Sequence, residues 1–223
     1  MTVLALEDAC AAYGGQRAIG PVTLTVREGE HVALVGRSGA GKSTLLSLLF
    51  DPGRRELALM PQELGLVQTL SVFHNVYMGR LAAHTAWYNV ANLVRPFARE
   101  IDGVGAVLDT LGMRAKLWSR VGELSGGQRQ RTAVARALYQ QASVLLADEP
   151  VSALDVTRAE DVMRTITSAY ATAVIAMHDV ELALRHCSRI VGIDAGRVAL
   201  DEPAHRLSVQ DLLPLYDYER AAG

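Results

Sequence analysis

Short apolar runs separated by turn signals dominate the hydrophobic pattern of this chain. Most are rich in branched residues and are followed by glycine, proline or a polar residue, which predicts buried strands. These runs span residues 31–35, 57–60, 144–147, 172–177 and 190–193. Several segments between these runs have apolar residues at helical spacing, for example residues 159–170. Strands that alternate with helices predict an α/β fold with a mainly parallel sheet.

The pattern changes between about residue 63 and residue 123. Val104, Val107, Leu108 and Leu111 keep helical spacing, and Gly112 marks a helix end. We therefore expect a mostly helical subdomain inserted between two halves of the sheet core. The sequence contains no run of about 18 apolar residues, so no membrane span is predicted. The N-terminus lacks the pattern of a signal peptide.

The stretch Gly36–Ser43 stands between the predicted strand at 31–35 and a predicted helix that begins near Thr44. Its spacing, G-x-x-x-x-G-K-S, is that of a phosphate-binding loop. Glycines allow a tight turn that brings backbone N–H groups onto an anion, and the following helix adds partial positive charge. Lys42 would reach the outer phosphates of a nucleotide, and the Ser43 hydroxyl would bind Mg²⁺. The candidate phosphate-binding residues are Gly36, Ser38, Gly39, Ala40, Gly41, Lys42, Ser43 and Thr44.

The alternative for this stretch is a glycine-rich turn that contains a lysine by chance. The strand before it and the helix after it disfavour that alternative. The loop therefore predicts a nucleotide site.

Polar residues directly follow other predicted strands, at the sheet edge where ligands of open α/β folds bind. Asp148 would hold Mg²⁺ opposite Ser43, and Glu149 would polarise a water for attack on a γ-phosphate. His178 would reach the same edge, and Gln62 would contact the metal or the attacking water. Taken singly, each has an ordinary alternative. These are a solvated turn for the two carboxylates, a capping or surface role for His178, and no role for Gln62.

Residues 2–7 and 22–26 alternate apolar and polar positions, which predicts half-buried strands. The turn Tyr13-Gly14-Gly15 lies between them, so we expect a small antiparallel sheet beside the nucleotide. Tyr13 would stack on the adenine ring, although a lone tyrosine in a turn is more often structural.

The composition is that of an ordinary folded protein and fits one large α/β domain of 223 residues, half of them hydrophobic. The formal net charge of −2 gives no reason to expect nucleic acid as a partner. Cys10 and Cys187 have no metal-ligand pattern, and we expect them to be reduced and buried in a cytosolic compartment.

Leu124-Ser125-Gly126-Gly127-Gln128 resembles the signature motif of ATP-binding-cassette (ABC) ATPases. The other motifs of that family follow in order, and the resemblance covers nearly the whole chain. They are the adenine-stacking aromatic (Tyr13), the Walker A loop (Gly36–Ser43), the Q-loop glutamine (Gln62), Walker B with the catalytic glutamate (Val144–Asp148 and Glu149), the D-loop (Ser152–Asp155) and the switch histidine (His178).

The resemblance implies a P-loop NTPase core, a small antiparallel β subdomain and an inserted helical subdomain, all within one ABC ATPase domain spanning 1–223. It implies ATP and Mg²⁺ as cofactors. It also implies that Ser125, Gly126 and Gly127 act on the ATP bound by an opposite subunit, and that Gln128 and Asp155 are nucleotide-binding residues. A second ABC ATPase subunit, most simply an identical chain, is therefore an expected partner.

The connection between Lys42 and Gln62 departs from the family pattern, because only 20 positions separate the two residues. Family members fit an additional strand pair there, which Asp51-Pro52-Gly53-Arg54-Arg55 short-cuts. We expect ATP binding to survive and the antiparallel β subdomain to be reduced.

The middle section is similar to ATPase subunits of phosphonate-type importers, on 70–76, 78–81 and 85–88. The resemblance implies transmembrane permease partners, membrane contact only through them, and a cytoplasmic, peripheral location on the inner face of the plasma membrane. The cargo would be phosphonate or a related oxyanion. Two alternatives remain open, which are a soluble ABC ATPase supporting a non-transport enzyme complex and a low-turnover nucleotide-binding regulatory module. Glu149 and His178 argue against the second alternative.

Overall fold

The computed structural model describes residues 1–14 and 16–216, without the side chains of Tyr13, Gln16 and Arg17. The chain forms two compact units. The core unit comprises Met1–Gln62, Ser143–Ser152 and Tyr170–Gly223, and the helical unit comprises Glu63–Ala142 and Ala153–Ala169.

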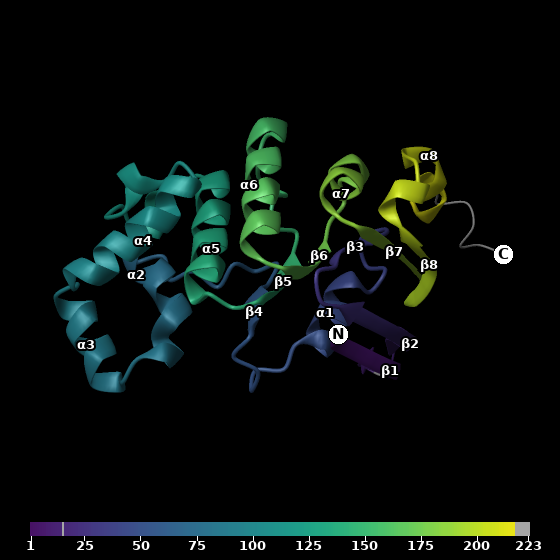
Figure 1. Ribbon diagram of the computed structural model, residues 1–223, viewed down its shortest axis with the longest axis horizontal. Coiled ribbons are helices and arrows are strands. Elements are labelled where there is room, and N and C mark those ends of the chain that lie inside the picture. The colour runs from purple at the N-terminus through teal and green to yellow at the C-terminus, as the bar shows by residue number, and fades with distance from the viewer. Residues whose placement is uncertain (15, 217–223) are drawn as a thin grey trace. The chain divides into compact units, whose positions relative to one another are not determined.

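A six-stranded sheet forms the centre of the core unit (Figure 1). Its strands, in spatial order, are β4 (Leu57–Met60), β5 (Val144–Asp148), β6 (Thr172–Ala176), β3 (His31–Val35), β7 (Arg189–Asp194) and β8 (Arg197–Pro203). The first five are parallel, and β8 pairs antiparallel with β7. The predicted mainly parallel sheet is thus confirmed.

The register of the parallel strands places several chain ends at one edge of the sheet. Asp148 at the end of β5 and Leu34 near the end of β3 both pair with Ala176 at the end of β6. Because carboxyl ends of parallel strands meet at the same edge, residues that follow β3, β5 and β6 emerge together. This edge carries the phosphate loop, Glu149 and His178.

A two-stranded antiparallel sheet, β1 (Thr2–Tyr13) with β2 (Gln16–Arg27), completes the core unit together with three helices. The helices are α1 (Lys42–Leu49), α7 (Val180–His186) and α8 (Val209–Leu212), with 3₁₀ turns at Ala204–Arg206 and Leu213–Leu215. Leu45 and Leu46 of α1 are fully buried in one apolar cluster with residues of both sheets. Burial of these two leucines fixes α1, and hence the loop before it, against the core.

β1 and β2 extend well beyond the predicted strands at 2–7 and 22–26. Their pairing changes register between Leu6 and Ala9, between Ala9 and Ala11 and between Ala11 and Ala12. These irregularities break the alternation of apolar and polar residues, which is why the predicted strands are shorter than the observed ones. Cys10 lies in this irregular stretch and is exposed, so its expected burial is wrong, whereas Cys187 is buried.

The connection from α1 to β4 is short, as expected from the sequence. It runs over residues 50–56 and turns at Asp51, whose carboxylate accepts the Gly53 N–H at 2.8 Å. The described residues form no strand between α1 and β4. The reduced antiparallel β subdomain is therefore confirmed.

The helical unit contains α2 (Val72–Tyr77), α3 (Ala86–Val94), α4 (Ala98–Thr110), α5 (Gly126–Gln140) and α6 (Val156–Ala169). Its 3₁₀ segments are Met78–Ala83, Arg114–Lys116 and Val121–Glu123. Both α2 and α4 pack on α5, with Phe73 and Leu108 fully buried. Within the described part of the chain, no helix has the length and apolarity needed to cross a bilayer.

Candidate functional site

The phosphate loop requires glycine at two positions where the backbone has positive φ and close neighbours. Gly36 has φ +140°, and a Cβ there would lie 2.1 Å from the Ile193 carbonyl oxygen. Gly41 has φ +110°, and a Cβ there would lie 3.0 Å from the Ala18 carbonyl oxygen. The backbones of β2 and β7 thus hold the loop closely, which an L side chain would prevent.

The N-terminus of α1 is left open towards this loop. Gly41 is its N-cap residue in the left-handed conformation, and no side chain caps the helix. The first-turn N–H groups of a helix have no intrahelical acceptor, so they are available to an anion, which the helix dipole also favours. The local sequence therefore builds a phosphate site from backbone alone.

Lys42 is 5% exposed and adds a charged donor to the loop. Its Nζ donates to the carbonyl oxygens of Gly36 at 2.7 Å and Arg37 at 2.9 Å. Burial lowers the pKa of Lys42, while the nearby carboxylates of Glu149 and Asp148 oppose that shift. An ammonium group has three donors, so one remains for a phosphate oxygen.

Asp148 is 6% exposed at the end of β5 and lies beside Ser43. Burial is the largest influence and raises the pKa of Asp148, whereas a hydrogen bond with the Ser43 side chain opposes the rise. A carboxylate and a hydroxyl are oxygen ligands of the kind Mg²⁺ uses together with phosphates and waters. The described residues contain no cluster of three or more His, Cys, Asp or Glu, as a cage of protein ligands would need. The pair fits a Mg²⁺ ion shared with nucleotide phosphates.

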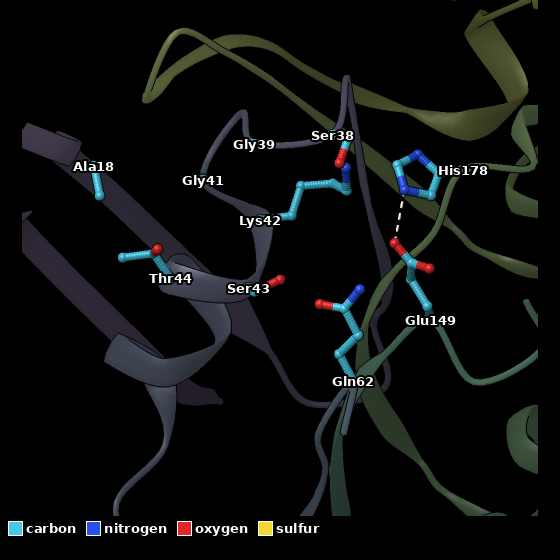
Figure 2. A pocket seen from close by; sticks show the side chains of 10 residues that line it. All are labelled: Ala18, Ser38, Gly39, Gly41, Lys42, Ser43, Thr44, Gln62, Glu149 and His178. Carbon is cyan, nitrogen blue, oxygen red and sulfur yellow. Dashed lines mark ion pairs between the residues drawn. The ribbon is translucent and has the colours of Figure 1, made fainter. Parts of the chain in front are cut away.

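Glu149 follows Asp148 and turns the chain with φ +52°. Its N–H donates to the Ala176 carbonyl at 2.9 Å, which ties this residue to the end of β6. Its Oε1 lies 2.6 Å from Nε2 of His178, as Figure 2 shows. The two residues follow neighbouring strands, so the sheet topology itself brings this acid and base together.

These groups surround one pocket of about 240 Å³ in the core unit (Figure 2). It is lined by Ala18, Ser38, Gly39, Gly41, Lys42, Ser43, Thr44, Gln62, Glu149 and His178. Lys42, Gln62 and Glu149 extend towards the same space, from the loop, the end of β4 and the end of β5. The structure thus brings together nine of the residues expected from the sequence at a nucleotide site.

Other expected residues are placed differently. Gly36, Ala40 and Asp148 belong to the loop and the strand end but do not line the pocket. Tyr13 ends β1, and its side chain lies outside the described residues, so its stacking role stays a prediction.

The signature segment lies in the helical unit, at the start of α5. Ser125 is the N-cap residue, and its hydroxyl accepts the Gln128 N–H at 3.3 Å. The Gln128 side chain in turn accepts the Ser125 N–H at 3.0 Å, which completes a capping box. Ser125 and Gly126 are exposed. Asp155 caps α6 by accepting the Arg158 N–H at 3.0 Å, and also pairs with the Arg158 guanidinium at 3.1 Å.

Two residues of the site were not predicted from the sequence. Ala18 lines the pocket from β2, and the Tyr216 hydroxyl accepts the Gly36 N–H at 3.1 Å. A small apolar residue in a strand and a tyrosine far along the chain carry no local signal of a nucleotide site. Only the tertiary fold brings them to the loop.

The fold and this pocket define a nucleotide-binding cassette of the P-loop type. A family model described as ABC transporter matches residues 19–53 and 50–152, more than half of the chain. The chain belongs to the ABC transporter family. The two matched pieces meet at 50–53, in the short connection between α1 and β4.

Curated relatives carry the name "Phosphonates import ATP-binding protein PhnC". The chain is 39% identical to the one from Anaeromyxobacter dehalogenans (strain 2CP-C), over 99% of this chain and 49% of that protein. It is 38% identical to the one from Pseudomonas entomophila (strain L48), over 96% of this chain and 92% of that protein. The chain therefore spans about half the length of the first relative and most of the second. The first alignment runs over 247 positions for a chain of 223 residues, so at least 24 positions of that alignment are absent here.

Solved structures share the fold. A dimeric structure of MJ0796, a bacterial ABC transporter cassette, aligns with a TM-score of 0.80 and 25% identity, over 91% of this chain and 99% of that one. A nucleotide-free ATP-binding cassette from an ABC transporter aligns with a TM-score of 0.78 and 18% identity, over 96% of both chains. The second similarity supports the fold alone.

Proposed function

We propose that this chain is the ATP-binding and ATP-hydrolysing subunit of an ABC importer for phosphonate or a related oxyanion. The observation that carries the ATPase assignment is the Glu149–His178 pair, which faces Lys42 and the open end of α1 in one pocket. The relatives' name supports the cargo class and the direction of transport.

In the proposed site the phosphates of ATP bind the N–H groups of residues 38–44, and the third donor of the Lys42 ammonium, which neither carbonyl uses, contacts them. Ser43 and Asp148 would hold Mg²⁺, with Gln62 as a further ligand. When bound, the ion neutralises developing charge on the phosphates. Because Asp148 is buried, its charge is poorly solvated until a cation arrives.

Glu149 orients and polarises the water that attacks the γ-phosphate. His178 holds the Glu149 carboxylate in place through the 2.6 Å contact. It also helps to stabilise the negative charge of the γ-phosphate. Catalysis by such a site comes mainly from positioning and from electrostatic stabilisation.

The pocket is completed in trans by another cassette, most simply a second copy of this chain. Ser125, Gly126, Gly127 and Gln128 bind the γ-phosphate held by the opposite subunit, and Asp155 contributes from the D-loop. Hydrolysis then releases the contact and lets the pair open. The partners on the membrane side are permease subunits, so the protein lies peripherally on the cytoplasmic face of the inner membrane.

We propose that residues 1–223 form one nucleotide-binding domain, in which the helical subdomain at about 63–123 is the first part of the helical unit. This subdomain contains the helices that would contact the permease. Trp87, Val90 and Val94 are 60–82% exposed along α3, so this helix presents apolar side chains for such a contact.

Purification of the affinity-tagged chain in detergent, followed by reconstitution with the copurifying membrane subunits, tests the transport assignment. ATP turnover in proteoliposomes should rise when the cognate solute-binding protein is added with a phosphonate. Copurification with a soluble enzyme complex and no membrane subunit would contradict the transport assignment. It would not bear on the ATPase assignment, which steady-state phosphate release by the Glu149→Gln variant tests separately.

A further inference from the structure

A second cavity, of about 310 Å³, lies within the helical unit between the end of α4, the middle of α5 and α6. Three arginines line it, which are Arg131 of α5 and Arg158 and Arg164 of α6. Asp161 is the one carboxylate among its lining residues. We call this space the arginine cavity. Its lining residues are separate from those of the nucleotide pocket.

Arg131 is the buried member of this group, with 8% of its surface exposed. One terminal nitrogen donates to the Leu111 carbonyl at 2.9 Å. Its Nε is buried and has no hydrogen-bond partner in the part of the chain that the structure describes. Buried donors are rarely left without an acceptor, so this N–H is available to a bound ligand or an ordered water.

The surrounding charges favour an anion over a cation. Arg158 pairs with Asp155 at 3.1 Å, and Arg164 pairs with Asp161 at 3.1 Å. Among the described residues no carboxylate lies within ion-pair distance of Arg131. Burial lowers the pKa of Arg131 most, and the nearby Arg158 lowers it further. The carboxylate of Asp155 partly offsets both effects. With three arginines and the carboxylates of Asp155 and Asp161 around it, the cavity carries an excess of positive charge.

We propose that the arginine cavity binds a tetrahedral oxyanion of the phosphate and phosphonate class, held by Arg131 and Arg158. The planar guanidinium group presents paired N–H donors that match two oxygens of such an anion. The hydroxyls of Thr110 and Thr165 donate to carbonyls of their own helices, at 2.8 Å each. The arginines are therefore the donors for the anion, and the volume leaves room for an organic substituent.

Occupancy of this site acts on the D-loop through Arg158. An anion competes with Asp155 for the Arg158 guanidinium, while the bond from the Arg158 N–H to the same carboxylate is retained. Asp155 thereby gains a free oxygen. The resulting change in ATP turnover rests on the proposed function, whereas anion binding itself does not. Coupling of this kind is reciprocal, so nucleotide state would alter the affinity for the anion.

The test is a titration of the ¹⁵N-labelled full chain, followed through the arginine Nε–Hε signals. Saturating MgADP occupies the diphosphate part of the phosphate loop. The Arg131 signal reports the arginine cavity, because Arg131 does not line the nucleotide pocket. Inorganic phosphate and methylphosphonate are titrated in separate samples at constant ionic strength. We expect a saturable shift of the Arg131 signal, and the tighter of the two ligands identifies the source of the anion.

Arg158→Gln should weaken that binding about tenfold or more, because it removes a charge-assisted donor pair. Arg206→Gln is the matched control, since Arg206 is exposed and pairs with Glu202 at 3.8 Å in the core unit. It should leave the dissociation constant within about twofold. A shift that never saturates, or equal constants in both variants, would overturn the proposal and indicate an adventitious ion only.

A failure of the proposed function is distinguishable from a failure of this proposal. Failure to bind MgADP would contradict the proposed function. In that case the same titration on Lys42→Ala, which weakens the phosphate loop as an anion site, still decides the arginine cavity.

Discussion

Two helices of this chain begin at glycine-containing turns, and their first turns are prepared for anions in opposite ways. α1 starts at Gly41 with no side-chain cap, so its N–H groups face the pocket with Lys42 beside them. α5 starts at Ser125, whose hydroxyl and partner Gln128 already occupy the first turn. The first-turn N–H groups of α1 are uncapped, whereas the first turn of α5 is capped by its own side chains.

The difference in capping favours anion binding at α1 before anion binding at α5. An anion at α1 finds unsatisfied donors and displaces nothing. An anion at α5 must displace a capping box, and such caps contribute about 1 kcal/mol. The long bond from Gln128 N–H to the Ser125 hydroxyl, 3.3 Å, makes that exchange easier. A phosphate already held by α1 of one subunit is therefore the ligand we expect for α5 of another.

The largest effect should come from removing the carboxylate of Glu149, which tests whether the open site performs chemistry. Glu149→Gln should lower steady-state phosphate release by roughly 10²–10⁴-fold, because the water loses its polarising group. Nucleotide affinity should change by less than about threefold, since α1 and Lys42 remain.

Glu181→Gln is the matched control, because Glu181 is exposed on α7 and pairs with Arg185 at 3.8 Å. It should keep wild-type turnover. Equal steady-state rates for Glu149→Gln and the wild type would remove the catalytic assignment.

The second effect sharpens why the open site needs its glycines. Gly36→Ala places a Cβ 2.1 Å from the Ile193 carbonyl oxygen, so β7 or the loop must shift. Urea unfolding should show a loss of about 3 kcal/mol in the free energy of unfolding.

Gly39→Ala provides the comparison, because Gly39 has φ +78° and open space around its Cβ position. It should lose only about 1 kcal/mol, from the left-handed backbone alone. Similar losses for the two variants would mean that the close approach to Ile193 does not hold the loop.

A third pair of variants separates capping from function at α5. Ser125→Asp keeps a good N-cap, so its free energy of unfolding should stay within about 0.5 kcal/mol of the wild type. Its turnover should fall about tenfold or more, because a carboxylate would meet the γ-phosphate of the partner subunit.

Ser125→Ala should instead lose about 1 kcal/mol of stability with a smaller loss of turnover. Chemical denaturation and steady-state phosphate release measure the two quantities on the same samples. Wild-type turnover in Ser125→Asp would show that α5 never receives the phosphate.

The smallest effect concerns Asp148, whose pKa burial raises. A carboxyl with a raised folded-state pKa favours folding when protonated and loses that contribution as pH rises through the folded pKa. Asp148→Asn imitates the protonated form and should therefore be more stable than the wild type at pH 8. The gain in the free energy of unfolding should be smaller than the loss caused by Gly36→Ala.

The advantage of Asp148→Asn should shrink as pH falls through the carboxyl range. Denaturation at pH 8 and at pH 4, without nucleotide or Mg²⁺, measures it. A variant less stable than the wild type at pH 8 would contradict the direction of the pKa shift.

Most of this architecture was predictable because strand burial and helix spacing leave a direct mark on the sequence. The strand at 57–60 has the predicted bounds, and the one at 31–35 ends at the predicted loop. The bulged pairing of β1 and β2 was not predictable, because shifts of register erase the alternation on which strand prediction depends.

The site shows the same division. Lys42, Glu149 and His178 follow strands, and parallel topology brings strand ends together, so their meeting could be predicted. Ala18 and Tyr216 reach the loop through tertiary contacts without any motif. Cys10 is exposed in the irregular part of β1, and no pattern in its neighbours indicated that exposure.

We expect the open start of α1 in one chain and the self-capped start of α5 in another to hold the same ATP. Light scattering of the purified Glu149→Gln variant with saturating ATP and Mg²⁺ measures this directly. We expect a species of twice the chain mass with ATP and a monomer with ADP. A monomer under both conditions would contradict it.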